Sequence, residues 1–332
     1  MVKDHRPRRG SMAYYPRKRA RSIVARVRRW VDTGKAQLLG FAGYKVGTLH
    51  VIKLEDNPNS PLYGQEVAKV ATVIETPPLF VVAVRAYERT PYGLKSLTEV
   101  WAQNIPKDLE RVVTLPKENV QEQQKRKLEE NLDRVAEVRV LVCTQPRKAG
   151  IGKKKPEFFE IKVGGDPKDA LNYALSVLGK EVRVSETFSV GQYVDVLAIT
   201  KGKGFSGVLK RFGVKELPRW HKHRKGSRRI GSVGPQKPAI MFTTPFAGQL
   251  GFHQRTEYNR RILKIGNAEK DRINPPGGWP HYGLVRGDFI LLEGTVPGPP
   301  KRLVKLRFAI RPPKEKREEP KIMYTSVEKV GG

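Results

Sequence analysis

The sequence contains a single cysteine, Cys143, among its 332 residues. A lone cysteine excludes disulfides within the chain and zinc sites built from several cysteines. It lies in the apolar run VRVLVCT, which is typical of a small buried hydrophobe in a strand. No apolar run approaches the roughly 18 to 20 residues that span a bilayer, and no charged start precedes an apolar signal core. We therefore expect a soluble, intracellular protein without a membrane partner.

Acidic residues are also scarce. The chain has 33 Asp and Glu against 64 Lys and Arg, which gives a net charge of +31. Such an excess repels itself unless a polyanion binds, and nucleic acid is the leading candidate. The hydrophobic content of 38% still suffices for one large core or two modest ones.

Signatures of catalysis are missing. The sequence has no G-x-S-x-G, no H-E-x-x-H and no acidic pair in an apolar context, so we expect no enzyme. Gly202, Gly204 and Gly207 do have the G-x-G-x-x-G spacing of a nucleotide-binding loop, directly after the apolar run VDVLAI. A dinucleotide site also needs an acid about 20 residues further on, whereas the only acid here, Glu216, comes too early. The motifs of P-loop proteins and protein kinases are absent as well. Two alternatives remain for these glycines: close approach of the backbone to phosphates, or a tight turn.

A metal site is not expected either. His221, His223 and His253, with Glu257 nearby, could suggest one. The run WHKHRKGSRR surrounds the first two with cations, which would repel a divalent ion. We therefore predict neither a metal nor a cofactor.

Most of the chain has the pattern of short strands, as in QLLGFAGYKVGTLHVIKL and EVAKVATVIETPPLFVVAVRAY. This spacing predicts an all-β barrel or sandwich. Two helices are expected between strands. One carries Leu128, Leu132 and Val135 on one face, and the other begins at Asp166-Pro167 and ends before Gly179.

Composition and pattern divide the chain into seven segments. They are a basic N-terminal arm (1–35), the first part of a barrel (36–87), an α+β insertion (88–184), the middle of the barrel (185–200), a long basic central extension (201–261), the final part of the barrel (262–315) and a C-terminal tail (316–332). The extension is read as non-periodic, with fifteen Lys or Arg and two acids. We expect the arm and the extension to become ordered on their partner.

Two runs of the extension, RWHKHRKGSRRIGS and GFHQRTEYNRRILKIG, mix cations with aromatic side chains. This combination contacts phosphates while it stacks on unpaired bases, and arginine suits planar contacts better than lysine. The expected target is a folded RNA with loops and bulges, and charge alone does not exclude duplex DNA.

The runs KGKGFSGVLKRFG, HKHRKGSRRIGSVGP and GQLGFHQRTEYNRRILKIG, together with the start HRPRRGSMAYYPRKRA, closely resemble the family of large-subunit ribosomal protein three in its archaeal and eukaryotic form. The resemblance covers most of the chain. It implies a mainly β fold with a closed β-barrel of the translation-protein type, an α+β insertion and long basic extensions.

The resemblance also implies a cytoplasmic protein of the large ribosomal subunit that binds 23S-type rRNA and joins the particle early in assembly. Its central extension would approach the peptidyl transferase centre, its other partners would be neighbouring large-subunit ribosomal proteins, and it would not be a homo-oligomer. The residues expected to bind rRNA are Arg6, Arg8, Arg9, Arg17, Lys18, Arg19, Arg21, Lys201, Lys203, Lys210, Arg211, Arg219, Trp220, His221, Lys222, His223, Arg224, Lys225, Arg228, Arg229, Gln236, His253, Arg255, Arg260 and Arg261.

One position departs from the family pattern. Relatives often carry Trp in a G-x-W-x-P element at the tip of the extension, whereas this chain has Gln236 between Pro235 and Lys237. Gln236 can donate and accept hydrogen bonds but offers no aromatic face, so a stacking role there is in doubt.

Two other functions fit part of the sequence. A free DNA-binding or chromatin-type protein would share the charge and the arm, but the chain lacks a helix-turn-helix or zinc-finger pattern. An RNA-modifying enzyme would use GKGFSG as a cofactor loop.

Overall fold

The computed structural model describes residues 8–115, 121–220, 222–313 and 319–327, which form a mainly β protein with several sheets and few helices. The chain divides into two compact units. We call residues 1–23 and 199–255 unit 1, and residues 24–198 and 256–332 unit 2. Because each unit has its own internal packing, each is described by itself.

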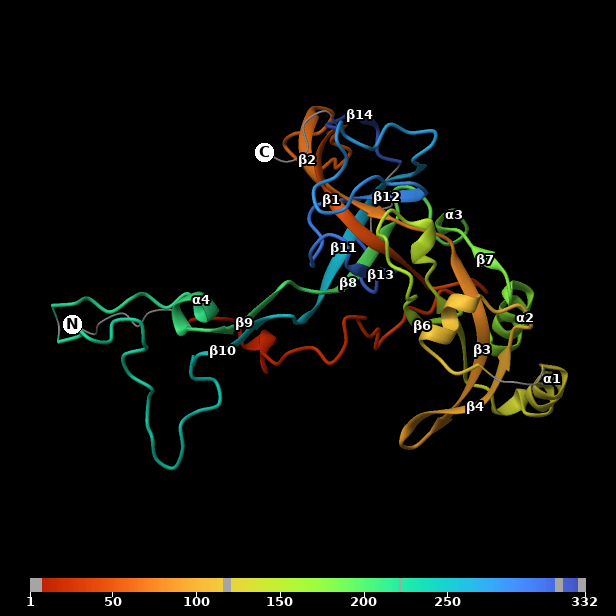
Figure 1. Ribbon diagram of the computed structural model, residues 1–332, viewed down its shortest axis with the longest axis horizontal. Helices are drawn as coiled ribbons and strands as arrows, with labels where there is room; N and C mark the ends of the chain where they lie inside the picture. The colour runs from red at the N-terminus through yellow and green to blue at the C-terminus, as the bar shows by residue number, and fades with distance from the viewer. Residues whose placement is uncertain (1–7, 116–120, 221, 314–318, 328–332) are drawn as a thin grey trace. The chain divides into compact units, whose positions relative to one another are not determined.

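The main sheet has seven strands in the order β13-β8-β11-β12-β2-β1-β14 (Figure 1). Its strands are β1 (Gly40–Leu54), β2 (Glu66–Glu75), β8 (Tyr193–Ile199), β11 (Gln254–Asn267), β12 (Asp288–Glu293), β13 (Leu303–Phe308) and β14 (Ile322–Thr325). β13 pairs with β1 as well as with β8, so the pairings that start at β13 lead through five other strands, β8, β11, β12, β2 and β1, and back to β13.

Apolar residues of these strands build the core of unit 2. Phe41, Ile74, Phe289 and Leu306 are among the side chains that are almost completely buried. Burial of such side chains contributes roughly 1.5–3 kcal/mol each, and it explains why the alternating apolar runs of the sequence become strands here.

A second sheet contains strands of the segment predicted as an insertion (88–184) together with β3, most of which lies in the segment predicted as the first part of the barrel (36–87). Its strand order is β4-β3-β5-β6, and β7 pairs with the start of β3. The bounds are β3 (Leu79–Thr90), β4 (Gly93–Trp101), β5 (Glu137–Cys143), β6 (Phe158–Lys162) and β7 (Glu181–Val182). Cys143 is buried at the end of β5, as predicted, and burial raises the pKa of its thiol to about 12. The thiol is therefore an inert packing group.

The helices of unit 2 are α1 (Gln121–Glu130), α2 (Pro167–Val177) and the single turn α3 (Val184–Thr187), with short 3-10 turns at Lys107–Arg111, Leu132–Arg134 and Pro146–Lys148. The second predicted helix is confirmed, with Asp166 at the N-cap position and Gly179 just beyond the end. The first is partly wrong, because α1 ends at Glu130 and a 3-10 turn follows. Leu128 and Val135 are nevertheless buried, so the expected apolar face exists without one continuous helix.

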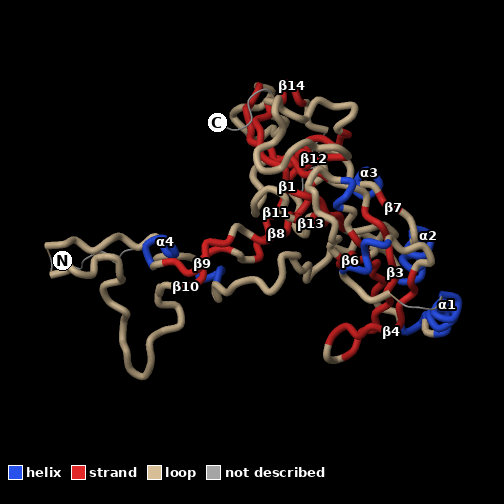
Figure 2. Tube along the Cα trace, viewed as in Figure 1, coloured by secondary structure: helices blue, strands red, loops and turns tan. Residues whose placement is uncertain are grey.

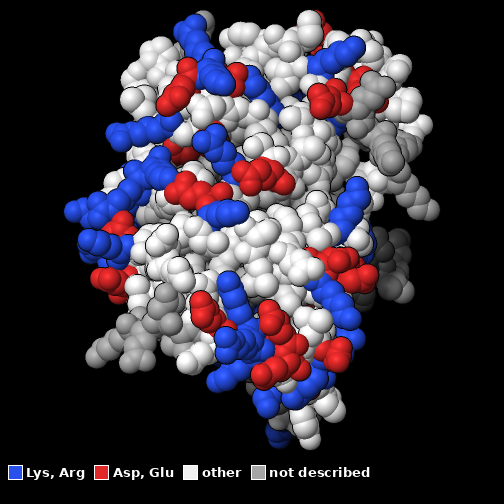
Figure 3. Space-filling model, turned by 90° about the vertical axis from the view of Figure 1, so that its right-hand side faces the viewer, with Lys and Arg blue, Asp and Glu red and all other residues white. Residues whose placement is uncertain are grey.

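Many surface cations of unit 2 are paired with acidic side chains, although the unit has 43 Lys or Arg against 31 Asp or Glu. On the face drawn in Figure 3, acidic and basic side chains lie beside one another. Arg134 pairs with Glu88 at 2.9 Å, Lys148 with Glu181 at 2.6 Å, and Arg147 with Asp108. These surface cations are therefore largely matched by carboxylates of the same unit.

Unit 1 contains the two-stranded sheet of β9 (Gly202–Ser206) and β10 (Gly248–Gly251), the five-residue helix α4 (Val208–Phe212) and a 3-10 turn at Met12–Tyr14. Figure 2 shows the chain between α4 and β10 as a long excursion of loop. In the described residues 213–247, no helix or strand occurs. The prediction that 201–261 is non-periodic is wrong at its ends, because β9 and α4 occupy its start and β11 begins at Gln254.

Candidate nucleic-acid interface

Unit 1 concentrates the positive charge of the protein. Its 80 residues carry 21 Lys or Arg and two acids, Asp4 and Glu216. In the part of the chain that the structure describes, all ion pairs lie in unit 2. Glu216 instead accepts a hydrogen bond from the Ser227 hydroxyl at 2.6 Å. The cations of unit 1 are thus available to an external polyanion.

Arginine–aromatic contacts hold the N-terminal segment of unit 1 to the central extension. The guanidinium carbon of Arg17 lies 4.4 Å from the ring centroid of Phe212 and 5.5 Å from that of Tyr15. Arg19 lies over Phe252 at 5.2 Å, and Arg255 lies over Tyr14 at 4.6 Å. Each such contact stabilises by roughly 0.5–2 kcal/mol, depending on desolvation. The sequence reading treated these arginines as RNA ligands only and missed their packing role.

Arg211 stabilises the same region through hydrogen bonds to backbone carbonyl groups. Its guanidinium donates to the carbonyl oxygens of Gln249 at 2.9 Å and Phe246 at 2.8 Å, and to that of Arg17 at 3.2 Å. Burial, followed by the nearby charge of Arg17, lowers the pKa of Arg211. With its donors engaged inside the unit, Arg211 shapes the surface that other residues present.

His253 also links the N-terminal segment to the rest of unit 1. The side chain is 7% exposed, and its Nδ1 lies 2.8 Å from the carbonyl oxygen of Lys18. Burial lowers the pKa of His253, and the charges of Arg255 and Arg211 act in the same direction. The imidazole is therefore neutral near pH 7, with Nδ1–H donating to Lys18, and it supplies no charge to a phosphate.

The remaining predicted cations of unit 1 are on its surface. Exposed residues of the predicted set are Arg8, Arg9, Lys18, Arg19, Arg21, Lys201, Lys203, Lys210, Arg219, Trp220, Lys222, Arg224, Lys225, Arg228, Arg229 and Gln236, and His223 is half-buried. Trp220 is 78% exposed among them. Arg6 and His221 lie outside the described residues.

Phe205 also belongs to this surface, although it was not among the residues predicted from the sequence. It lies on β9, is 80% exposed, and lines a hollow of about 350 Å³ with Lys203, Lys210 and Arg228. An exposed ring between cations is suited to stack on a base whose phosphates the cations neutralise. Phe205 could have been predicted as a stacking residue because it follows two lysines in KGKGFSG, but only the glycines of this run were interpreted.

Arg260 and Arg261 are placed within unit 2. Arg261 is 1% exposed and pairs with Asp56 at 2.6 Å, and Arg260 pairs with Glu257 at 3.0 Å. Successive residues of β11 point to opposite faces, so Arg261 enters the core while Arg260 stays partly exposed. The structure gives Arg261 an ion pair inside unit 2.

No group of three or more His, Cys, Asp or Glu side chains in the described ranges could hold a metal ion. In those same ranges, no helix has the length and apolar content needed to cross a bilayer.

Comparisons with known proteins agree over the full length of the chain. The family model described as "Ribosomal protein L3" matches residues 1–330. "Large ribosomal subunit protein uL3" of Pyrobaculum calidifontis is 56% identical, with 99% of each chain covered. The proteins of the same name from Caldivirga maquilingensis and Archaeoglobus fulgidus are 52% and 48% identical, with at least 98% of each chain covered.

Proposed function

Because the chain belongs to the ribosomal protein L3 family, we propose that it is a structural component of the large ribosomal subunit and binds 23S-type rRNA through unit 1. The single observation that carries this proposal is the charge of unit 1, with 21 basic residues against two acids. Exposed Phe205 and Trp220 add faces for unpaired bases.

Phosphate neutralisation is the proposed mechanism. Lys and Arg side chains that contact phosphates release condensed counterions, which favours binding and lets RNA helices converge around the protein. The long loop excursion between α4 and β10 fits between such helices because it has little core of its own. The chain supplies no catalytic group to this function, and it acts in the cytoplasm as part of the ribosome.

The finer parts of the proposal rest on the family resemblance. The central extension, 201–261, reaches toward the peptidyl transferase centre, and the protein joins the subunit early in assembly. The main sheet closes as a barrel that seats on rRNA, which the pairing of β13 with both β1 and β8 supports. Neighbouring ribosomal proteins contact the charge-balanced second sheet of unit 2.

Sedimentation tests the proposal. A native lysate is run through a sucrose gradient before and after a high-salt wash, and the protein is followed by mass spectrometry. Persistence in the large-subunit peak after the wash is the expected result, since buried contacts resist the screening that weakens surface charge. Migration at the top of the gradient would instead favour a free nucleic-acid-binding protein.

A further inference from the structure

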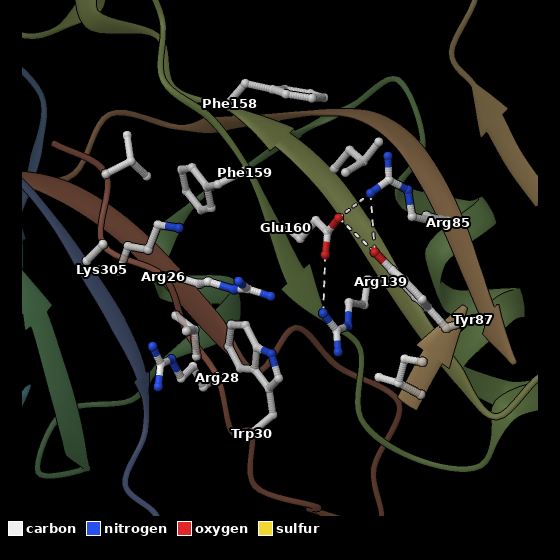
Figure 4. A pocket seen from close by; sticks show the side chains of 15 residues that line it. Arg26, Arg28, Trp30, Arg85, Tyr87, Arg139, Phe158, Phe159, Glu160 and Lys305 are labelled. Carbon is white, nitrogen blue, oxygen red and sulfur yellow. Dashed lines mark hydrogen bonds and ion pairs between the residues drawn. The ribbon is translucent and has the colours of Figure 1, made fainter. Parts of the chain in front are cut away.

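Unit 2 contains a hollow that the proposed function does not use. Its volume is about 800 Å³, and it is lined by residues 24–28, by Trp30 and by side chains of β3, β4, β5, β6 and β13. Figure 4 shows Arg26, Arg28, Trp30, Phe159 and Lys305 on one side of it, with Arg85 and Tyr87 on the other. We call it the Lys305 hollow.

The cations on the Arg85 side are already neutralised. Arg85 pairs with Glu99 at 2.7 Å and also with Glu160. Arg139 pairs with Glu137 at 3.0 Å and with Glu160 at 3.2 Å, and the Tyr87 hydroxyl donates to Glu160 at 2.8 Å. On this side of the hollow, three carboxylates therefore face two guanidinium groups, which need no further anion.

Lys305 is in a different situation. The side chain is 6% exposed, and its amino nitrogen lies 4.1 Å from the centroid of the Phe159 ring. Among the described residues, that amino group has no hydrogen bond and no ion pair. A buried ammonium without a paired anion is costly, and burial lowers the pKa of Lys305 to about 7 although the carboxylate of Glu160 acts in the opposite direction. An anion that enters the hollow would remove this cost.

The wall beside Lys305 adds a second cation and a ring. Arg28 is exposed and has no ion pair within the described residues, and Trp30 is half-buried. Trp30 is held against β1 at Gly40, where an added Cβ would lie 2.9 Å from the indole ring. The glycine thus lets the indole pack on the backbone, which fixes the ring at the edge of the hollow.

We propose that the Lys305 hollow binds one nucleotide of a single-stranded RNA segment, with its phosphate at Lys305 and Arg28 and its base against Trp30. The two cations account for the phosphate, and the fixed indole accounts for the base. An acidic peptide would use the cations but leave the ring without a function. The inference rests on the proposed function only in that RNA is the partner, since it assigns a site on unit 2, outside the surface of unit 1.

Ultraviolet cross-linking of purified large subunits tests the site. Subunits that contain the chain as their sole copy are irradiated, and RNA-conjugated peptides are identified by mass spectrometry. We expect conjugates on the peptide that carries Arg28 and Trp30. Lys305→Met should lower their yield about tenfold, as expected for one lost charge-assisted contact. Trp30→Phe should retain the conjugates because it keeps an aromatic face.

Lys95→Met provides the matched control, because Lys95 is an exposed lysine of β4 outside the hollow, and its yield should equal that of the wild type. Conjugates on unit 1 without any at Trp30, or a yield unaffected by Lys305→Met, would overturn the hollow as a nucleotide site. A protein cross-linked at Trp30 would overturn it in favour of a peptide ligand. Absence of conjugates from unit 1 as well would contradict the proposed function itself.

Discussion

The guanidinium of Arg17 lies 4.4 Å from the ring centroid of Phe212 and donates to the carbonyl oxygen of Arg211 at 3.1 Å. This contact joins residues 195 positions apart in the sequence. Tyr15 stacks on the other edge of the same cluster, with its ring centroid 6.1 Å from that of Phe212. The N-terminal segment and the start of the extension are therefore packed together by arginine and aromatic side chains in a unit that has few buried apolar residues.

A double-mutant cycle on Arg17→Ala and Phe212→Ala should give a coupling free energy of about 1–2 kcal/mol. Either single substitution already removes the partly desolvated cation–π contact, so the double variant should lose less stability than the sum of the two single variants. Hydrogen exchange of the amides in β9 and α4 of the full chain measures the coupling free energy. Arg19→Ala with Phe212→Ala is the control and should be additive, since Arg19 lies over Phe252. Additivity in the Arg17 cycle as well would mean that the contact does not stabilise unit 1.

Removal of four surface charges from the extension should weaken RNA binding without unfolding unit 2. For Arg224, Lys225, Arg228 and Arg229 changed to Ala, the slope of log affinity against log salt should become shallower by about 3, at roughly 0.7 per single-stranded phosphate contact. Titration of large-subunit RNA at several salt concentrations measures this slope, and subunit yield should fall.

The control for that variant removes the same number of charges from unit 2, at Lys125, Arg126, Lys127 and Arg134 in and after α1. It should leave the slope within experimental error. Equal slopes in the two variants, or an unchanged particle yield and translation rate in the first, would contradict an RNA-binding role of the extension.

Local signals were sufficient for much of the fold. The run EVRVLVC alternates and becomes β5, and Asp166-Pro167 with Gly179 brackets α2. The boundary of β11 could not be predicted in this way, because its first half, QRTEYNRR, is polar and pairs only through partners distant in sequence. Likewise, the divided first helix depends on Asn131, whose side chain donates to the Lys127 carbonyl where the helix stops.

The candidate site was predictable as a charge distribution but not as a set of contacts. Composition indicated that cations gather in this part of the chain, and Arg228 and Lys203 are exposed in unit 1. It could not show that the Arg211 guanidinium would donate to backbone carbonyl oxygens or that Arg261 would be buried against Asp56, because these partners lie 35 or more residues away in sequence. Lys305 was missed for the same reason, as its burial depends on β6 and residues 24–30.

Asp195 should be essential to the stability of unit 2. It is fully buried, pairs with Arg307 at 3.1 Å, and accepts hydrogen bonds from the backbone N–H groups of Asn259 and Ile310. Asp195→Ala leaves a buried arginine without its partner, which should lower the free energy of unfolding by about 3–5 kcal/mol. Urea unfolding measures the loss. Glu257→Ala, which breaks the more exposed pair with Arg260, should cost at most about 1 kcal/mol.

Lys305 should make the stability of the free protein depend on pH. Burial, opposed by the carboxylate of Glu160, lowers its pKa from 10.5 to about 7 in the folded chain. Between these values the unfolded chain binds more protons than the folded one, so stability rises with pH by up to about 1.4 kcal/mol per pH unit. Below pH 7 both states are protonated and the penalty is complete.

Urea unfolding near pH 7 and near pH 10 measures this dependence, and Lys305→Met should remove the part that Lys305 contributes. Lys95→Met, at an exposed site, should leave the dependence as in the wild type. The same slope in the Lys305→Met variant would show that the lysine keeps its ordinary pKa.

Substitution of Gly202, Gly204 and Gly207 by alanine, one at a time, distinguishes the two roles proposed for them, a tight turn or close approach of the backbone to phosphates. Gly204 has φ +64°, so Gly204→Ala should destabilise β9 by about 1 kcal/mol, although open space surrounds it. An added Cβ at Gly202 would make an ordinary contact of 3.7 Å with Phe252, and one at Gly207 would meet nothing within 4 Å. Gly202→Ala and Gly207→Ala should therefore leave stability unchanged. If the Gly202→Ala and Gly207→Ala variants also bind large-subunit RNA as tightly as the wild type, the glycines serve the turn of unit 1. A loss of affinity at unchanged stability would show that RNA phosphates approach this backbone too closely to admit a methyl group.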